Sequence, residues 1–390
     1  MSPEASGPLT GLKVLDFSTL LPGPFASQLL ADMGAQVTRI ESPSRPDLLR
    51  QLSPRVGGES AAHLTINRNK RSLALDLKAP QAIEVVRRLV AEHDILLEQF
   101  RPGVMARLGL DYPSLRECNP RLIYCSLTGY GQSGPLAHRA GHDINYLALS
   151  GLASYSGRTE PVLSGTQVAD LAGGSQQAVI AILAALFERQ SSGLGRHLDV
   201  AMAEGALALN AMASAAVGCG APAPQPGTEV LNGGSLYDYY ATADGRYLAV
   251  GALEPQFALA FFQAIDRPNW AAHALAPPGQ QSELKGEIAA VIAEQSLDVW
   301  RQRFAALDCC VEPVLNLDEA MAHPQFVARG MVRQLTHQGQ SITQLACPLN
   351  RQGPMRPGAA LGQHSETVLK ELGYGEAEIA DLKASGAVAG

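Results

Sequence analysis

The sequence predicts an α/β protein, because short apolar runs typical of strands alternate with longer segments that have helical periodicity. The opening of the chain carries the first such unit. Lys13–Phe17 is a predicted buried strand, Leu21–Pro24 a turn, Phe25–Met33 a helix and Gln36–Glu41 a second strand. A strand, a helix and a strand in this order form a βαβ unit, and its two strands run parallel.

The pattern continues through the next ninety residues. Apolar residues at helical spacing between Ile83 and Val90 predict a crossover helix over Ala79–Ala91. Further strands are predicted for Ser72–Asp76, Asp94–Leu97 and Leu122–Leu127.

Length and composition narrow the class of protein. A chain of 390 residues predicts two domains, and the Ala-, Pro- and Gly-rich stretch Gly218–Gly227 is the predicted boundary between them. The formal net charge of -7 argues against a nucleic-acid partner, since phosphate contacts need a basic face.

Cysteine usage and the absence of targeting signals predict a soluble, cytoplasmic protein. The six cysteines form no Cys-x-x-Cys pair, so we expect reduced thiols. Met1–Thr10 is polar and unlike a signal peptide, and the apolar run Ala178–Phe187 is too short to span a bilayer. We therefore expect no membrane partner.

Several familiar sites are absent from the sequence. Glu41 stands about where a ribose-binding acid follows the first strand, but the Gly-x-Gly-x-x-Gly fingerprint of dinucleotide sites is missing. There is no phosphate-loop motif, no His-Glu-x-x-His or Cys/His metal spacing and no Gly-x-Ser-x-Gly elbow. We expect no metal and no NAD or FAD.

One stretch combines an imidazole with a carboxylate. His142 follows a glycine-rich loop, Gly129–Pro135, and Asp170 stands just before Gly173 and a long apolar helix. A helix start carries free amides and partial positive charge, so we expect Asp170 to stay ionised and neighbouring amides to face an oxyanion. The alternatives are a hydrogen-bonded core histidine and a simple helix cap.

The wording of this stretch resembles a known family. Gly-His-Asp-Ile-Asn-Tyr-Leu-Ala-Leu-Ser-Gly from Gly141, followed by Ala-Asp-Leu-Ala-Gly-Gly from Ala169, is similar to the class III CoA-transferase family of CaiB/BaiF type, and within it to the α-methylacyl-CoA racemase branch. The resemblance covers nearly the whole chain. It implies a Rossmann-like parallel sheet in a large domain, a smaller α+β domain and an interlocked homodimer. The implied domains are residues 1–217, 228–325 and a segment 326–390 that returns to the large domain.

The same resemblance assigns residues to coenzyme A, which enters as part of the substrate, with no separate cofactor. Cations in Asn67–Arg71 would meet its phosphates, although such a cluster is otherwise typical of a solvated strand edge. Glu98–Gly103 is similar to a motif whose arginine lies near CoA. Ser42 stands where relatives carry a nucleotide-contacting arginine, so either Arg45 substitutes or the adenine is held more loosely. The residues expected to contact substrate or CoA are Lys70, Arg71, Leu75, Lys78, Gln99, Arg101, Arg107, Gly141, Asp143, Asn145 and Tyr146.

A third catalytic candidate follows the predicted boundary. Glu254 precedes a proline, which is commonly just a helix start. The segment Gly251–Phe257 is similar to a racemase motif whose glutamate approaches the catalytic histidine, from the same or the partner subunit. Glu254 is therefore expected to orient or polarise His142.

Two reactions of acyl-CoA fit these residues. In a racemase of 2-methylacyl-CoA thioesters, His142 and Asp170 exchange the α-proton on opposite faces, and amides near Asp170 and Gly173 stabilise the enolate. In a CoA-transferase, Asp170 attacks the thioester and a carboxylic acid later collects the CoA. His142 and Glu254 favour the racemase, whereas Leu171 after Asp170 is more similar to the sequence of transferase relatives. A non-catalytic acyl-CoA-binding protein is the third alternative, and it would not need both His142 and Asp170.

Overall fold

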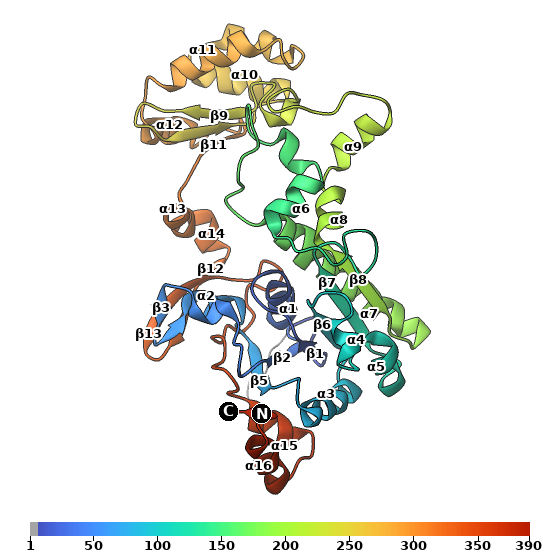
Figure 1. Ribbon diagram of the computed structural model, residues 1–390. Helices are drawn as coiled ribbons and strands as arrows, with labels where there is room; N and C mark the ends of the chain where they lie inside the picture. The colour runs from blue at the N-terminus through green and yellow to red at the C-terminus, as the bar shows by residue number, and fades with distance from the viewer. Residues whose placement is uncertain (1–6) are drawn as a thin grey trace. The chain divides into compact units, whose positions relative to one another are not determined.

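The computed structural model describes residues 7–390, so the first six residues of the predicted N-terminal segment Met1–Thr10 lie outside it. The chain divides into two compact units (Figure 1). Of the described residues, unit 1 contains 7–147, 166–209 and 324–390, and unit 2 contains 148–165 and 210–323.

Unit 1 is built on a seven-stranded sheet with the order β14-β5-β2-β1-β6-β7-β8. Its strands are β1 (Lys13–Asp16), β2 (Gln36–Glu41), β5 (Lys70–Leu75), β6 (Ile95–Glu98), β7 (Ile123–Thr128), β8 (His197–Ala201) and β14 (Val388–Ala389). Six strands are parallel, and only β14 pairs antiparallel with its neighbour. The strand order reverses between β1 and β6, and in such sheets ligands bind beyond the carboxyl ends at this point.

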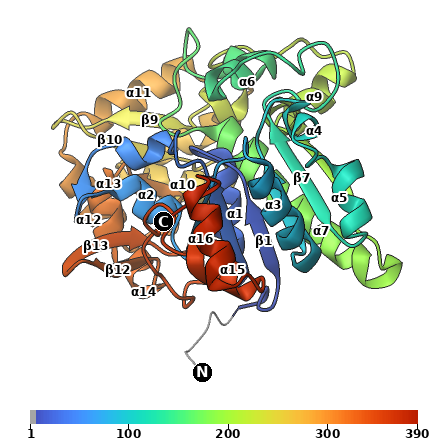
Figure 2. The ribbon, with the colours of Figure 1, turned by 60° about the horizontal axis from the view of Figure 1, so that its bottom comes forward.

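Helices cover both faces of the sheet. On one face α1 (Pro22–Asp32) packs against α7 (Gln177–Ser192), and on the other α3 (Pro80–Glu92) packs against α5 (Tyr112–Cys118). The second face shares its apolar core with the C-terminal helices α15 (Ser365–Glu371) and α16 (Glu376–Ala384) (Figure 2). The predicted α/β class with a Rossmann-like sheet is thus confirmed.

The start of β5 differs from the sequence prediction. The strand begins at Lys70 and not at Ser72, because Lys70 and Arg71 pair in register with Val37 and Thr38 of β2. The two cations therefore lie at the amino end of β5, which stands between β2 and the edge strand β14 in the sheet.

The helix that follows Asp170 also starts earlier than expected. Residues Ala169–Gln176 form a π-helix that runs directly into α7. Gly173 packs closely here, since a Cβ on it would lie 2.9 Å from the amide nitrogen of Ala206 in α8 (Met202–Ala208). Small residues let the two backbones meet at this point.

The π-helix and α7 together form a longer apolar helix than the run Ala178–Phe187 suggested. Residues Ala169–Ser192 are long and apolar enough, by length and composition alone, to cross a membrane. The core helix of a globular protein meets the same criterion, and Ile182 and Ala185 of α7 are buried in unit 1. The sequence underestimated this length because the two glycines looked like a break.

The remaining elements of unit 1 are short. They are β3 (Arg55–Val56), β4 (Glu59–Ser60), α2 (Ala61–Ile66), α4 (Val104–Arg107), α6 (Asp143–Leu149, which ends in unit 2), α14 (Pro324–Ala328), β12 (Val332–His337) and β13 (Gln340–Leu345).

Unit 2 is a small α+β unit around one aromatic core. A three-stranded antiparallel sheet is ordered β11-β10-β9, and an Asp244-Gly245 turn joins β9 to β10 with Gly245 at a φ of +72°. Trp300 is buried and donates from its indole N–H to the carbonyl of Ile292 at 2.8 Å. Its elements are α9 (Ala211–Gly218), β9 (Asp238–Ala241), β10 (Tyr247–Val250), α10 (Pro255–Ala264), α11 (Ser282–Ile292), α12 (Leu297–Phe304), β11 (Val311–Pro313) and α13 (Leu317–Ala322).

Candidate active site

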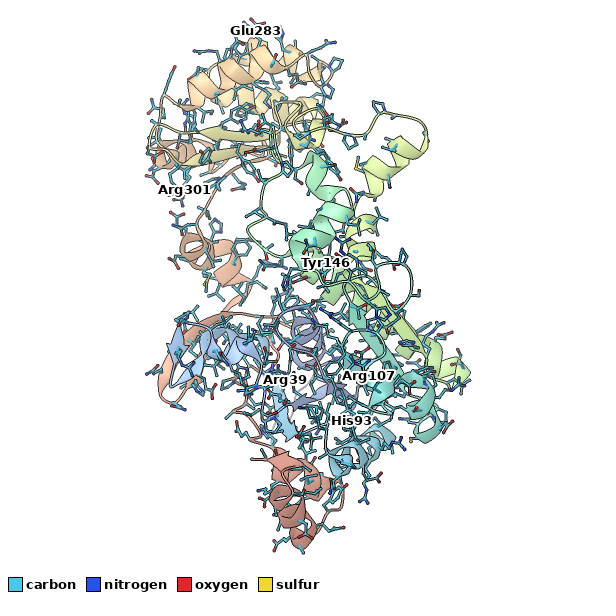
Figure 3. All side chains as sticks on the ribbon, viewed as in Figure 1. Arg39, His93, Arg107, Tyr146, Glu283 and Arg301 are labelled. Carbon is cyan, nitrogen blue, oxygen red and sulfur yellow. The ribbon has the colours of Figure 1, made fainter. Side chains whose placement is uncertain are left out.

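A cavity of about 480 Å³ lies at the carboxyl edge of the sheet in unit 1. It borders the ends of four parallel strands, β1, β2, β5 and β6, where the strand order reverses. Three of the residues expected at CoA line it, namely Leu75, Lys78 and Arg107. Arg107, labelled on α4 in Figure 3, and Lys78 are exposed and free to meet phosphate oxygens.

The wall of this cavity contains a buried ion network. Arg50 forms two hydrogen bonds with Glu41, Nε to Oε1 at 3.0 Å and Nη2 to Oε2 at 2.7 Å. Arg39 donates to Glu41 at 3.0 Å and also pairs with Asp47. Burial would raise the pKa of Glu41, but the two guanidinium groups outweigh it and hold that pKa at about 2. Glu41 is thus committed to the network and is not a free ribose ligand.

Ser42 follows this network and lines the cavity, as does Arg45. Arg45 is exposed and is therefore placed to supply the cation that Ser42 does not.

Lys70 and Arg71 are not placed as expected. The Lys70 ammonium is buried and bonds the Pro24 carbonyl at 2.8 Å, the Asn67 side chain at 2.9 Å and Asp16 at 3.3 Å. Arg71 pairs with Glu371 at 2.7 Å. Both lie at the amino end of β5, away from the carboxyl-edge cavity. Neither residue lines the carboxyl-edge cavity, because pairing with β2 holds both in the sheet, and their expected contact with the CoA phosphates remains a prediction.

A second cavity of unit 1, of about 400 Å³, contains the predicted histidine. Gln99 and Arg101 line it beside His142, and Phe100 borders both this cavity and the first. Gln99 is fixed by a hydrogen bond that its side-chain oxygen accepts from the Gly23 amide at 3.0 Å. Gly141, Asn145 and Tyr146, also expected at the substrate, complete this wall.

The backbone around His142 is set by the tyrosine that follows it. Tyr146, labelled in Figure 3, is buried and its hydroxyl donates to the Gly141 carbonyl at 2.7 Å. A Cβ on Gly141 would lie 2.7 Å from the Tyr146 ring, so only glycine fits. The His142 amide donates to the Asn145 side chain at 2.9 Å, which caps the start of α6. His142 itself remains exposed.

Asp170 is joined to the His142 segment through Asp143. The Asp143 carboxylate accepts a hydrogen bond from the Asp170 amide at 3.0 Å. The pKa of Asp170 is raised to about 6. Burial is the largest cause, the negative charge of Asp143 is the second, and His142 acts against both. Burial thus outweighs the helix start in setting this pKa, and Asp170 is mostly ionised at neutral pH and takes up its proton near pH 6. The Asp170 amide is also engaged and cannot bind an oxyanion.

Glu254 lies in unit 2, at the start of α10, and is exposed. Its expected approach to His142 remains a prediction.

Comparison with known proteins identifies the family. The model of CoA-transferase family III matches residues 9–365. The chain belongs to this family. It is 38% identical to human alpha-methylacyl-CoA racemase, covering 96% of each chain. It is 33% identical to human succinyl-CoA:glutarate CoA-transferase, covering 98% of this chain and 90% of the relative.

Solved structures agree with this assignment. The crystal structure of a CaiB/BaiF family protein from Brucella suis matches with a TM-score of 0.79 and 30% identity, over 94% of this chain and 99% of that one. This family member thus shares its fold with the CaiB/BaiF proteins.

Sequence reasoning missed several residues that line the site of this CoA-transferase family III protein. Tyr130 and Arg139 border the cavity with His142, and Tyr130 packs edge-on against Tyr146 with ring centroids 5.2 Å apart. Tyr130 lies within the glycine-rich loop Gly129–Pro135 and Arg139 lies between this loop and His142, and these positions were the available signal. Within residues 7–390, no group of three His, Cys, Asp or Glu side chains could hold a metal ion.

Proposed function

We propose that this protein epimerises the α-carbon of 2-methylacyl-CoA thioesters. The observation that carries the proposal is the hydrogen bond of 3.0 Å from the Asp170 amide to the Asp143 carboxylate, which joins Asp170 to the segment that bears His142, together with an Asp170 carboxyl group whose pKa is about 6. Inversion without a cofactor needs two groups that hold and release a proton near neutral pH. The 38% identity to the human racemase supports the same reaction.

In this mechanism, one group removes the α-proton while the other delivers a proton to the opposite face. His142 acts on one face and Asp170 on the other, and the roles reverse for the other enantiomer. A carboxyl group with a pKa of about 6 is present in both protonation states near neutral pH, as the two directions require. The Asp143 hydrogen bond to the Asp170 amide holds the two segments in a fixed relation.

The substrate would lie across the two cavities of unit 1. Exposed Arg45, Lys78 and Arg107 at the first cavity suit the phosphates of CoA. The acyl thioester then reaches the second cavity past Phe100, which borders both.

We further propose that the protein works as a cytoplasmic homodimer with interlocked subunits. The segment from Leu209 to Val217 exposes several large apolar side chains, among them Met212, which is 77% exposed. Apolar surface of this kind marks protein interfaces. Glu254 would reach His142 in that assembly.

CoA transfer is the second candidate, and one observation favours it. The cavity with His142 is lined by Arg101 and Arg139 and, within the described residues, by no carboxylate side chain. Arginine binds carboxylates well, so an acceptor acid would be held here. Asp170 would then attack the thioester carbonyl to form a mixed anhydride and release the CoA thiolate. The thiolate would attack the Asp170 carbonyl of this anhydride, which releases the donor acid and leaves an aspartyl-CoA thioester. The acceptor carboxylate would displace CoA from that thioester to form a second anhydride, and the thiolate would attack its acyl carbonyl to give the new acyl-CoA and restore the Asp170 carboxylate.

One experiment separates the two reactions. A single enantiomer of a 2-methylacyl-CoA is incubated with the protein in heavy water, with no acceptor acid, and followed by NMR and chiral analysis. We expect loss of the α-proton signal together with loss of optical purity, and both should disappear in His142→Ala and Asp170→Asn. Absence of exchange, with CoA transferred to an added carboxylic acid, would establish the transferase and overturn the racemase.

A further inference from the structure

Glu98 is a buried acid that neither reaction uses. It is the last residue of β6, at the carboxyl edge of the sheet, and is only 3% exposed. All residues of the loop that follows it, Gln99–Pro102, line the cavity that contains His142, and Phe100 also lines the first cavity. Glu98 thus directly precedes the loop Gln99–Pro102, which lines the proposed substrate site.

The Glu98 carboxylate turns back onto this loop. Its Oε2 accepts a hydrogen bond from the Phe100 amide at 2.8 Å. The side-chain oxygen of Gln99 accepts a hydrogen bond from the Gly23 amide at 3.0 Å. The loop is therefore held by two hydrogen bonds, one to Glu98 and one from Gly23. The position of Phe100, which borders both cavities, therefore depends directly on the Glu98 carboxylate.

Glu98 is held by the neighbouring strands as well. It is in register with Ser126 of β7, which hydrogen-bonds to it, and the Ser126 hydroxyl also lies 3.0 Å from Nε2 of His197 on β8. The His197 ring stacks on Tyr112 with centroids 5.6 Å apart. The carboxylate thus ends a polar chain that runs across three strands into an otherwise apolar core.

We propose that Glu98 is a positioning residue that couples the affinity for CoA thioesters to pH by anchoring the loop Gln99–Pro102 through the Phe100 amide. The anchor is strong when the carboxylate is charged and weaker when it is protonated, because hydrogen bonds to a charged acceptor are roughly twice as strong as neutral ones. This inference rests on the proposed binding of CoA in unit 1.

The surroundings of Glu98 place this change near neutral pH. The pKa of Glu98 is raised to about 7. Burial is the largest cause, the hydrogen bonds from Ser126 and Phe100 lower the pKa, and the charge of Asp199 raises it. Since a carboxyl group is charged above its pKa, the loop is firmly anchored above pH 7 and loosens below it.

The other ionisable groups around Glu98 come from β7, β8 and the segments after β6. A small cavity of about 280 Å³ beside Glu98 is lined by the ionisable side chains of Arg101, Asp111, Tyr112, Tyr124 and His197. Cys125 of β7 and Tyr124 stay neutral, because burial and the Glu98 charge raise the pKa of each far above the working range. Burial lowers the pKa of His197, so it too is mostly neutral above pH 7.

The test compares CoA binding by the wild-type protein and by Glu98→Gln between pH 6 and pH 8, using calorimetry with CoA itself. The glutamine keeps an acceptor for the Phe100 amide but has no charge. We expect a Kd ratio of variant to wild type near one at pH 6 and about threefold to tenfold at pH 8. The ratio cancels any titration of the CoA phosphates. An exposed acid of α3, in Glu84→Gln, is the matched control and should show no pH-dependent ratio.

A second variant guards against a purely structural effect of the glutamine. Ser126→Ala removes a hydrogen bond that lowers the pKa of Glu98, so the transition in Kd should move to higher pH. A ratio for Glu98→Gln that is the same at pH 6 and pH 8 overturns the inference, as does an unmoved transition in Ser126→Ala. Failure of the wild-type protein to bind CoA at any pH would instead refute the proposed function.

Discussion

Asp143→Asn should shift the pH dependence of the reaction without dismantling the site. The asparagine retains a side-chain oxygen for the Asp170 amide, so the 3.0 Å hydrogen bond can persist. What disappears is the negative charge, the second contributor to the raised pKa of Asp170 after burial. The substitution therefore separates an electrostatic role of Asp143 from a structural one.

The size of the effect follows from the pKa of Asp170. Its value of about 6 lies roughly two pH units above the usual 3.8, with burial as the larger cause and His142 acting in opposition. Removal of the Asp143 charge should thus lower the pKa of Asp170 by about 0.5 to 1 unit, or ~0.7 to 1.4 kcal/mol. Asp170 would then lose its proton at lower pH, and the corresponding limb of the profile would move in the acid direction.

The assay is kcat/KM for α-proton exchange between pH 4.5 and pH 8, since this parameter reports the pKa values of the free enzyme. The exposed Glu283, far along the chain in unit 2, provides a charge-matched control as Glu283→Gln. An unshifted acid limb in Asp143→Asn, with activity retained, would show that burial alone sets the pKa of Asp170. Asp143→Ala, which loses the hydrogen bond as well, should reduce kcat and not only shift the profile.

Three further substitutions test the site and its support. Arg107→Ala should raise KM for the acyl-CoA about tenfold with kcat nearly unchanged, and the difference should shrink at high salt, because the proposed contact of Arg107 is to a phosphate of CoA. Arg50→Met leaves the buried Glu41 with half its charge partners and should lower the free energy of unfolding in urea by about 3 to 5 kcal/mol; a loss below 1 kcal/mol would contradict the network's role. Gly141→Ala places a Cβ 2.7 Å from the Tyr146 ring and should abolish activity while leaving the CoA affinity within about twofold, as measured by calorimetry.

Much of unit 1 was predictable because its strands are buried on both faces. Such strands appear as short apolar runs, as in Ile95–Leu97 of β6. The strand β2 was located to the residue although Thr38 and Arg39 interrupt its apolar side chains. The C-terminal strand β14 was not predictable, since two residues give no periodicity and it exists only through pairing with β5. The assignment of residues 148–165 to unit 2 was also not predictable, because it depends on tertiary contacts that no local signal indicates.

The candidate site also contains some residues that the sequence could identify and some features that it could not. Residues in distinctive local sequence, such as His142 and Asp170, could be named from the chain alone. Lys70 could not be placed, because a cation before a strand looks the same whether it faces a phosphate or a buried Asp16. The pKa of Asp170 could not be predicted either, since it depends on burial and on a carboxylate 27 positions earlier, Asp143.

The raised pKa of Asp170 bears on the choice between the two reactions. A nucleophilic carboxylate must be ionised, so a pKa of about 6 confers no advantage on a transferase at neutral pH. A group that must alternately give and take a proton works best with a pKa close to the pH at which it operates. Asp143 adds to this rise and also joins the Asp170 amide to the segment that bears His142. The raised pKa of one acid, and the link from its amide to the segment of an imidazole, are the two features that support the proposed proton exchange over nucleophilic attack.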